Sequence, residues 1–353
     1  MTGGYRIIVI SAVSALAMVQ GCAPPVEESY SSSVQLARLT PEMKQSAEQI
    51  LREQCGTPNR PKMLANSRMD SQHLKRGQEV YRQYCQQCHG VTGDGNGPVA
   101  KYMIPRPRDY RRGIFKFTST TYGSKPLRED LHRTIRRGVM GTSMPSFDLL
   151  PPSDLEAVTD YVMALTHRGE LEAQLADAAE FDGKIDPAAV PGMVEGIMNL
   201  WKEARSNVVN PRAPMPTLTK ADVVAGKEIF LKIGCNKCHG DQGRAEVTDE
   251  LPPDIWGNPN KAADITAGML RGGTEPLDVY RRIEAGINGT SMPAFKAQFE
   301  KNPEDIWKLV AYVMSVYDMR RDGVIPASGY YKPYPGAGQA SEKPADVPAN
   351  GGE

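Results

Sequence analysis

The sequence is poor in aromatic residues, has no net charge and has few long apolar stretches. Phe, Trp and Tyr make up 7 % of its 353 residues, and 42 basic residues balance 42 acidic ones. This balance gives no sign of a nucleic-acid partner. The apolar stretch at residues 7–19 has 13 residues, whereas a membrane-spanning helix needs about 20. The length of the chain is enough for two or three small domains.

The apolar stretch near the N-terminus has the features of a targeting signal. It follows Arg6 and ends before Gly21 and Cys22, and a short apolar core after a basic residue predicts a signal peptide at 1–21. Gly21-Cys22 resembles the lipobox of bacterial lipoproteins, in which the cysteine is acylated. Gln20 is unusual there, so cleavage nearby without a lipid is the alternative. Either way we expect an exported protein on the periplasmic side of a membrane, with a lipid on Cys22 as the anchor.

Four of the six cysteines lie in two matching pentapeptides. These are Cys85-Gln86-Gln87-Cys88-His89 and Cys235-Asn236-Lys237-Cys238-His239. A Cys-x-x-Cys-His motif is typical of c-type haem attachment, because each thiol can bond one vinyl group while the adjacent histidine binds the iron. The alternative is one zinc ion held by four cysteines. The motifs predict two covalently bound haem c groups, attached through Cys85, Cys88, Cys235 and Cys238, with His89 and His239 as iron ligands.

A second repeated motif favours haem over zinc. Gly-Thr-Ser-Met-Pro occurs at 141–145 and again at 289–293. Its methionines, Met144 and Met292, follow the two histidines by 55 and 53 residues. A histidine on one side of the iron and a methionine on the other is the ligation of electron-transfer cytochromes c. We therefore predict Met144 and Met292 as the second iron ligands.

The neighbouring Met140 tests this choice. Its counterpart in the second half is Asn288, so the repeat does not preserve a methionine there. Because methionine more often fills a core than binds a metal, Met140 is predicted to be no ligand.

The repeat extends beyond the ligand motifs. Residues 130–138 match residues 278–286 at an offset of 148, which indicates one structural unit used twice. Each unit is expected to contain a first helix, the haem motif, a short helix, the methionine loop and a last helix. A glycine on the first helix would let the last helix approach closely. The expected crossing pairs are Gly77 with Tyr161 and Gly226 with Tyr312.

This order of motifs resembles class I cytochrome c, twice over. The resemblance implies an all-α fold of two tandem class I cytochrome c domains, each a few helices around a covalently bound haem. No segment left over is long enough by itself to form a separate binding module. The expected divisions are a signal peptide at 1–21, an N-terminal tether at 22–73, the first domain at 74–168, a partly helical linker at 169–220, the second domain at 221–320 and a disordered tail at 321–353.

A basic stretch in the first domain has two interpretations. Class I cytochromes use arginines in this region to bond a haem propionate, so the resemblance implies this role for Arg106 or Arg108. Alternatively, the stretch is a solvated loop that attracts an acidic redox partner, in line with a net charge of +5 over 70–168 and −3 over 221–320. The counterpart at 252–256 lacks arginine, which predicts weaker compensation of the second propionates.

The remaining cysteine and histidines are expected to have no part in ligation. Cys55 is interpreted as a buried or capped thiol without a role, and a disulfide with Cys22 is the alternative if Cys22 is not acylated. The histidines expected at the surface are His73, His132 and His167.

These features predict a protein that transfers single electrons and is not an enzyme. The expected donor is a quinol-oxidising complex or a dehydrogenase, and the expected acceptor is a terminal oxidase or reductase. The chain would act alone or as a subunit of a membrane-associated respiratory complex. The alternative is a di-haem peroxidase, which needs one iron with an open position. Two equivalent methionine loops argue against it.

Overall fold

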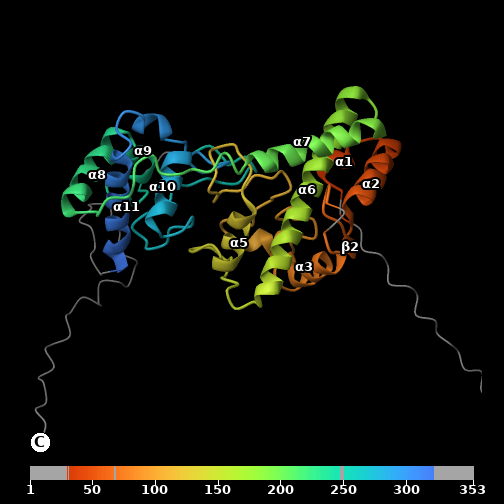
Figure 1. Cartoon of the computed structure of the whole chain (residues 1–353), viewed down its shortest axis with the longest axis horizontal. Helices are drawn as coiled ribbons and strands as arrows, with labels where there is room; N and C mark the ends of the chain where they lie inside the picture. The colour runs from red at the N-terminus through yellow and green to blue at the C-terminus, as the bar shows by residue number, and fades with distance from the viewer. Residues whose placement is uncertain (1–29, 31, 67–68, 247–249, 322–353) are drawn as a thin grey trace, which may run out of the picture.

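The computed structural model describes residues 30, 32–66, 69–246 and 250–321. The regular secondary structure of this part is helical apart from one short antiparallel pair, β1 (Gly56–Thr57) with β2 (Arg60–Pro61). Helices α8–α11 gather at one end of the molecule, while α1 and α2 lie at the opposite end, and α3 and α5 lie between these groups (Figure 1). The all-α prediction is confirmed.

The first repeated unit contains α3 (Ser71–Tyr84), α4 (Gln86–His89), α5 (Arg128–Arg137) and the first half of α6 (Pro152–Asp182). Asp70 caps α3 by accepting a hydrogen bond from the backbone N–H of Gln72, which satisfies a donor that the first turn leaves free. The apolar faces of these helices form one core, whose buried members are Val80, Tyr81, Tyr110, Ile135, Leu155, Val158, Tyr161, Val162 and Leu165.

The second repeated unit has the same order of helices. They are α8 (Lys220–Lys232), α9 (Asn236–His239), α10 (Pro276–Ala285) and α11 (Asp305–Arg321). Thr219 and Asp222 form a reciprocal capping box at the start of α8, which fixes where that helix begins.

In both units the first helix crosses the last one at a glycine. A Cβ atom on Gly77 would overlap the carbonyl oxygen of Ala157, and one on Gly226 would overlap that of Lys308. The β-carbon of the expected tyrosine, Tyr161 or Tyr312, lies beside each glycine. Only glycine allows the two backbones to come this close, so the predicted crossings are confirmed.

Helix α6 does not end with the first repeated unit. It has 31 residues and ends at Asp182, so the predicted division between residues 168 and 169 falls inside an unbroken helix. The start of the predicted, partly helical linker is the second half of this helix. Gly169 lies within the helix at a place where a Cβ atom would overlap Arg111, which shows how closely the 109–113 loop packs on it.

The second half of α6 belongs to a third hydrophobic core. It packs with α1 (Val34–Ala37), α2 (Pro41–Cys55) and α7 (Val190–Glu203). The buried residues of this core are Leu36, Ala47, Ile50, Leu51, Cys55, Leu64, Leu171, Leu175, Ala176, Val190 and Ile197. The predicted tether and the predicted linker thus form one helical unit together, although neither could build a core alone.

Residues 204–218 connect this third unit to the second repeated unit and touch both repeated units on the way. Val208 forms an isolated antiparallel bridge with Thr120 of the first unit. Further along, the backbone carbonyl of Ala213 accepts a hydrogen bond from Trp307 Nε1 at 2.9 Å, and the backbone N–H of Arg212 donates to the Tyr280 hydroxyl at 3.2 Å. The connection therefore lies along the surface of both units.

Candidate haem sites

The first cysteine–histidine motif lies where α3 ends. Cys85 follows Tyr84, caps α3 and starts the single turn of α4, which ends at His89. Cys235 stands in the same relation to α9 and His239. The turn is held by a hydrogen bond from the histidine N–H to the first cysteine carbonyl, 2.9 Å long in both units. One helical turn thus brings the two thiols and the imidazole to the same wall of a cavity.

Each histidine ring is oriented by a backbone carbonyl. His89 Nδ1 lies 3.2 Å from the carbonyl oxygen of Arg108, and His239 Nδ1 lies 2.9 Å from that of Ala263. A carbonyl can only accept, so Nδ1 carries the proton in both rings and Nε2 is left to bind a metal. Burial lowers the pKa of both histidines, which favours the neutral imidazole that an iron requires.

The two methionine loops have the same hydrogen bonds. In the first, Thr142 Oγ1 donates to the Val139 carbonyl at 2.7 Å and accepts from the Met144 N–H at 3.1 Å. The corresponding distances from Thr290 in the second are 2.9 and 3.2 Å. The repeated Gly-Thr-Ser-Met-Pro sequence therefore encodes one loop geometry, used twice to present a methionine.

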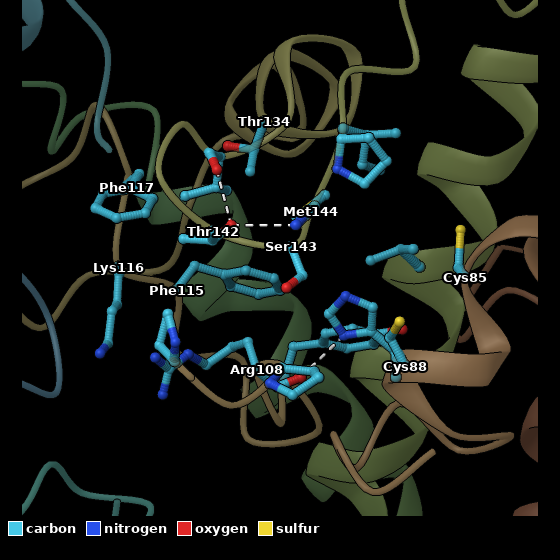
Figure 2. A pocket seen from close by; sticks show the side chains of 18 of the residues that line it. Cys85, Cys88, Arg108, Phe115, Lys116, Phe117, Thr134, Thr142, Ser143 and Met144 are labelled. Carbon is cyan, nitrogen blue, oxygen red and sulfur yellow. Dashed lines mark hydrogen bonds between the residues drawn. The ribbon is translucent and has the colours of Figure 1, made fainter. Parts of the chain in front are cut away.

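The structure brings each predicted ligand set together. Cys85, Cys88, His89 and Met144 line one cavity, here called the first cavity. Figure 2 shows its two cysteines on one side and Met144 on the loop that faces them. The second cavity is lined by Cys235, Cys238, His239 and Met292. Met140 lines neither of them, so the repeat selected the methionine that faces the cysteines.

The lining of both cavities suits a porphyrin. Their walls are mainly apolar, and their charged side chains are all cations. The first cavity has Arg106, Arg108, Lys116 and Arg271, and the second has Lys116, Lys261, Arg271 and Arg282. An apolar slot with a nitrogen and a sulfur ligand on opposite walls and positive charge at its edge matches a haem, whose ring is apolar and whose propionates are negative.

Comparison with known proteins agrees with this geometry. Residues 72–162 match the family described as cytochrome c oxidase, cbb3-type, subunit III, and residues 223–317 match the family cytochrome c. No curated protein matches the chain. A solved chain of the Kuenenia stuttgartiensis reducing HAO-like protein complex is 32 % identical, with a TM-score of 0.53. The match covers 69 % of this chain and 96 % of that one.

The chain is a tandem class I cytochrome c. The cytochrome fold places the residues predicted as ligands in two equivalent positions and indicates that the protein binds haem c. Which side chains bind iron remains a prediction from the motifs and from the way they face each cavity.

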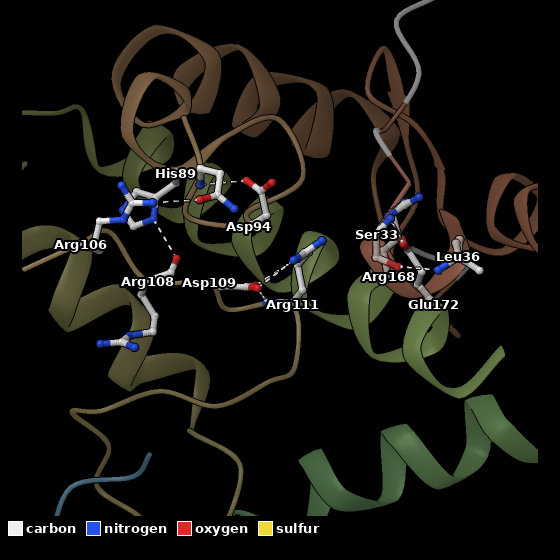
Figure 3. Close-up of polar contacts among 11 residues, drawn as sticks. Ser33, Leu36, His89, Asp94, Arg106, Arg108, Asp109, Arg111, Arg168 and Glu172 are labelled. Carbon is white, nitrogen blue, oxygen red and sulfur yellow. Dashed lines mark hydrogen bonds and ion pairs between the residues drawn. The ribbon is translucent and has the colours of Figure 1, made fainter. Parts of the chain in front are cut away.

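Three arginines of the basic stretch in the first cytochrome domain, Arg106, Arg108 and Arg111, are half-buried. Arg108 crosses to the second domain, where its guanidinium lies 3.6 Å from the centre of the Trp256 ring and 3.4 Å from Asp254. Arg111 is paired with Asp109 at 2.8 Å. Figure 3 shows these arginines directed away from one another. Arg106 and Arg108 both line the first cavity, which favours the propionate interpretation over a solvated loop.

Two further expectations need correction. His167 was expected at the surface but is 1 % exposed, because α6 continues past it into the third core and Trp201 packs on its ring at 4.7 Å. The second propionates were expected to be less well compensated than the first, yet the second cavity has as many cations as the first. Its four cations include Lys116 of the other domain and Arg282 on α10. Contacts across a domain boundary could not be read from the 252–256 segment.

Sequence reasoning also missed the residues that line both cavities. These are Lys116, Phe117 and Arg271. No motif marks them, and they come from two loops more than 150 residues apart.

Proposed function

We propose that this cytochrome is an exported di-haem electron carrier that passes single electrons between respiratory partners. The observation that carries the proposal is the duplicated pair of facing ligands, a carbonyl-oriented histidine opposite a threonine-held methionine in each domain. Two such sets predict two haems with no open iron position. Saturated iron in a rigid pocket suits electron transfer without substrate binding.

The protein residues have separate tasks in this function. Thioether bonds from the four cysteines would retain haem through redox cycling. The haem iron, when bound, supplies the one-electron couple. The methionine thioethers favour the reduced state and raise the potential relative to a second imidazole, and the cations at the cavity edge act in the same direction because reduction removes positive charge.

The solved relative supports a role within an assembly. That protein is a chain of a reducing HAO-like protein complex, and the match extends over nearly its full length. We propose that the present chain likewise docks on a redox enzyme and exchanges electrons with it. A quinol-oxidising complex or dehydrogenase would be the donor, and a terminal oxidase or reductase the acceptor.

Attachment to a membrane is proposed through Cys22. No helix in the described part of the chain is both long and apolar enough to cross a bilayer. The expected signal peptide and Cys22 lie outside the described residues, as does most of the expected tail at 321–353. The sequence of the lipobox supports the proposal of a lipid anchor on the periplasmic side.

The competing proposal is a di-haem peroxidase. It would require that one iron lose its methionine or exchange it for peroxide. The matching hydrogen bonds of the two methionine loops favour electron transfer, because nothing in the described residues marks one loop as releasable.

Haem content and spin state test the proposed function. The purified protein should contain two haems per chain that survive a denaturing gel, both low-spin in the oxidised state and neither reactive with peroxide. A ratio of one haem per chain, or a high-spin ferric signal in the untreated protein, would refute the di-haem carrier.

A further inference from the structure

The two haem cavities meet at the boundary between the domains. Lys116 and Phe117 come from the first domain and Arg271 from the second, and all three line both cavities. The ring of Phe117 lies against Gly272, since a Cβ atom there would be 3.3 Å from the ring edge. The two cavities therefore share a wall, which consists of one aromatic ring and two cations.

This shared wall is held in place by an arginine of the second domain. Arg282 of α10 donates to the carbonyl of Lys116 at 2.9 Å and also to the carbonyl of Thr118. Its position corresponds to Thr134 in the first domain, so the repeat does not require an arginine there. The long side chain reaches across the domain boundary and fixes the backbone that carries Lys116 and Phe117.

The shared wall carries more positive than negative charge. Asp254 is the carboxylate that faces it, and this group lies 3.3 Å from Lys116 and 3.4 Å from Arg108. In the described part of the chain no carboxylate pairs with Arg271. Burial, and then the charge of Arg108, lower the pKa of Lys116 to about 8, and Arg271 contributes in the same direction. Two cations thus share one carboxylate while the charge of Arg271 also acts on Lys116, an arrangement that further anions would stabilise.

We propose that Lys116 and Arg271 act as counter-charges for the propionates of both haems and thereby set the two midpoint potentials together. The inference rests on the proposed function, because it needs a haem in each cavity. A positive charge beside a haem favours the reduced iron. A cation shared by two haems should therefore raise both potentials, and a cation that lines one cavity should raise one.

The chain provides matched controls for this test. Arg106 lines the first cavity but not the second, and Lys261 lines the second but not the first. Arg271 and Lys261 are exposed, so changing either leaves the core intact. Replacing Lys116 leaves Asp254 paired with Arg108. Glutamine is used at all four positions, because it is shorter than lysine or arginine, keeps a polar end group and removes the positive charge.

The experiment is a spectroelectrochemical titration of the purified holoprotein and its variants at low ionic strength. The two waves are assigned with Met144→Ala, which perturbs the first haem. R271Q and K116Q should each lower both midpoint potentials. R106Q should lower the first alone and K261Q the second alone. The proposal is overturned if R271Q and K116Q each move only one wave or neither.

Haem analysis separates failure of this inference from failure of the proposed function. If the wild type binds fewer than two haems, the di-haem carrier is refuted and this inference with it. The other case is that every variant retains two haems and the unfolding temperature of the wild type. If replacing a shared cation then shifts the midpoint potentials in the same pattern as replacing a single-cavity cation, only the inference about the shared wall is refuted.

Discussion

A single threonine sets the position of each predicted methionine ligand. Thr142 donates to one backbone carbonyl of its loop and accepts from the N–H of Met144, and Thr290 does the same for Met292. The bond that each threonine hydroxyl donates and the one that it accepts hold the methionine where a metal ligand is needed. The loop is short, so little conformational entropy is lost when these bonds form. Ligand geometry at this scale depends on a residue two positions away from the ligand.

Replacing Met144 with alanine should open the first iron. We expect a lower potential for the first haem, a high-spin ferric signal and a new reaction with peroxide, because the soft sixth ligand is lost. The second haem should keep its spectrum. Optical and magnetic-resonance spectra of the oxidised protein measure each of these effects.

Met140→Ala is the matched control. Met140 is 45 % exposed and lies in the same loop region, so its loss should leave both haem spectra unchanged. If Met140→Ala instead abolished the charge-transfer band of methionine-ligated ferric haem, the assignment of Met144 would be wrong.

His167 should make stability depend on pH. Burial lowers its pKa from 6.5 to about 4, with Lys125 contributing, and neither ring nitrogen has a hydrogen-bond partner in the described structure. Below pH 6.5 the unfolded chain binds a proton that the folded chain does not, so folding stability falls until about pH 4. The loss through this one group is roughly 3 kcal/mol.

His167→Phe should remove this part of the pH dependence. Phenylalanine keeps an aromatic ring against Trp201 and cannot bind a proton. Denaturant unfolding at several pH values between 4 and 7 should show a smaller fall for the variant than for the wild type. Parallel curves would mean that the buried histidine is not a titrating group in this range.

At the scale of elements, the repeated helix crossing determines where the haem motif lies. Because α3 and α6 touch backbone to backbone at Gly77, the end of α3 is fixed relative to the last helix of the domain. The cysteine motif follows within a few residues, so this contact positions the thiols. The second domain uses Gly226 in the same way.

Gly77→Ala should destabilise the first domain by about 1–3 kcal/mol, the usual cost of overpacking a core. Gly196→Ala is the control. Gly196 lies in α7 with nothing within 4 Å of the added carbon, so the better helix propensity of alanine should stabilise the protein by up to about 1 kcal/mol. Both changes can be measured by thermal or denaturant unfolding. Equal effects at the two positions would contradict the close crossing.

At the scale of the whole molecule, three cores are joined without a loose connection between them. Helix α6 runs from the first cytochrome domain into the third core, and residues 204–218 continue along the surface of both cytochrome domains. With the side chains of Arg108 and Arg282 crossing the boundary as well, the two haem cavities are expected to keep a constant separation.

Cys22→Ser should release the protein from membranes or leave it unprocessed. One acyl chain binds a bilayer only marginally, whereas the several chains of a bacterial lipoprotein hold it stably. Fractionation of cells that express the wild type and the variant measures the difference. Wild-type protein found entirely in the soluble periplasmic fraction would contradict the lipobox interpretation.

The sequence predicted those parts of the molecule that are repeated or carry a motif. Both cysteine–histidine motifs, both methionine loops and the glycine crossings could be located because each half checks the other. The first residues of the last helices, Pro152 of α6 and Asp305 of α11, were not among the features that the repeat predicted. The third core and the shared wall were missed because they depend on contacts between segments that are far apart in the sequence and occur once.

The third core also has a consequence for the order in which the chain folds. Its N-terminal helices end by Cys55, but their partners on α6 and α7 lie between Leu171 and Ile197. The first cytochrome domain is thus an insertion between the two halves of another unit. That domain can complete its own core first, while the apolar faces of α1 and α2 stay exposed until the segment from Leu171 to Ile197 packs on them. Closing so long a loop is slow, so we expect the third core to form last.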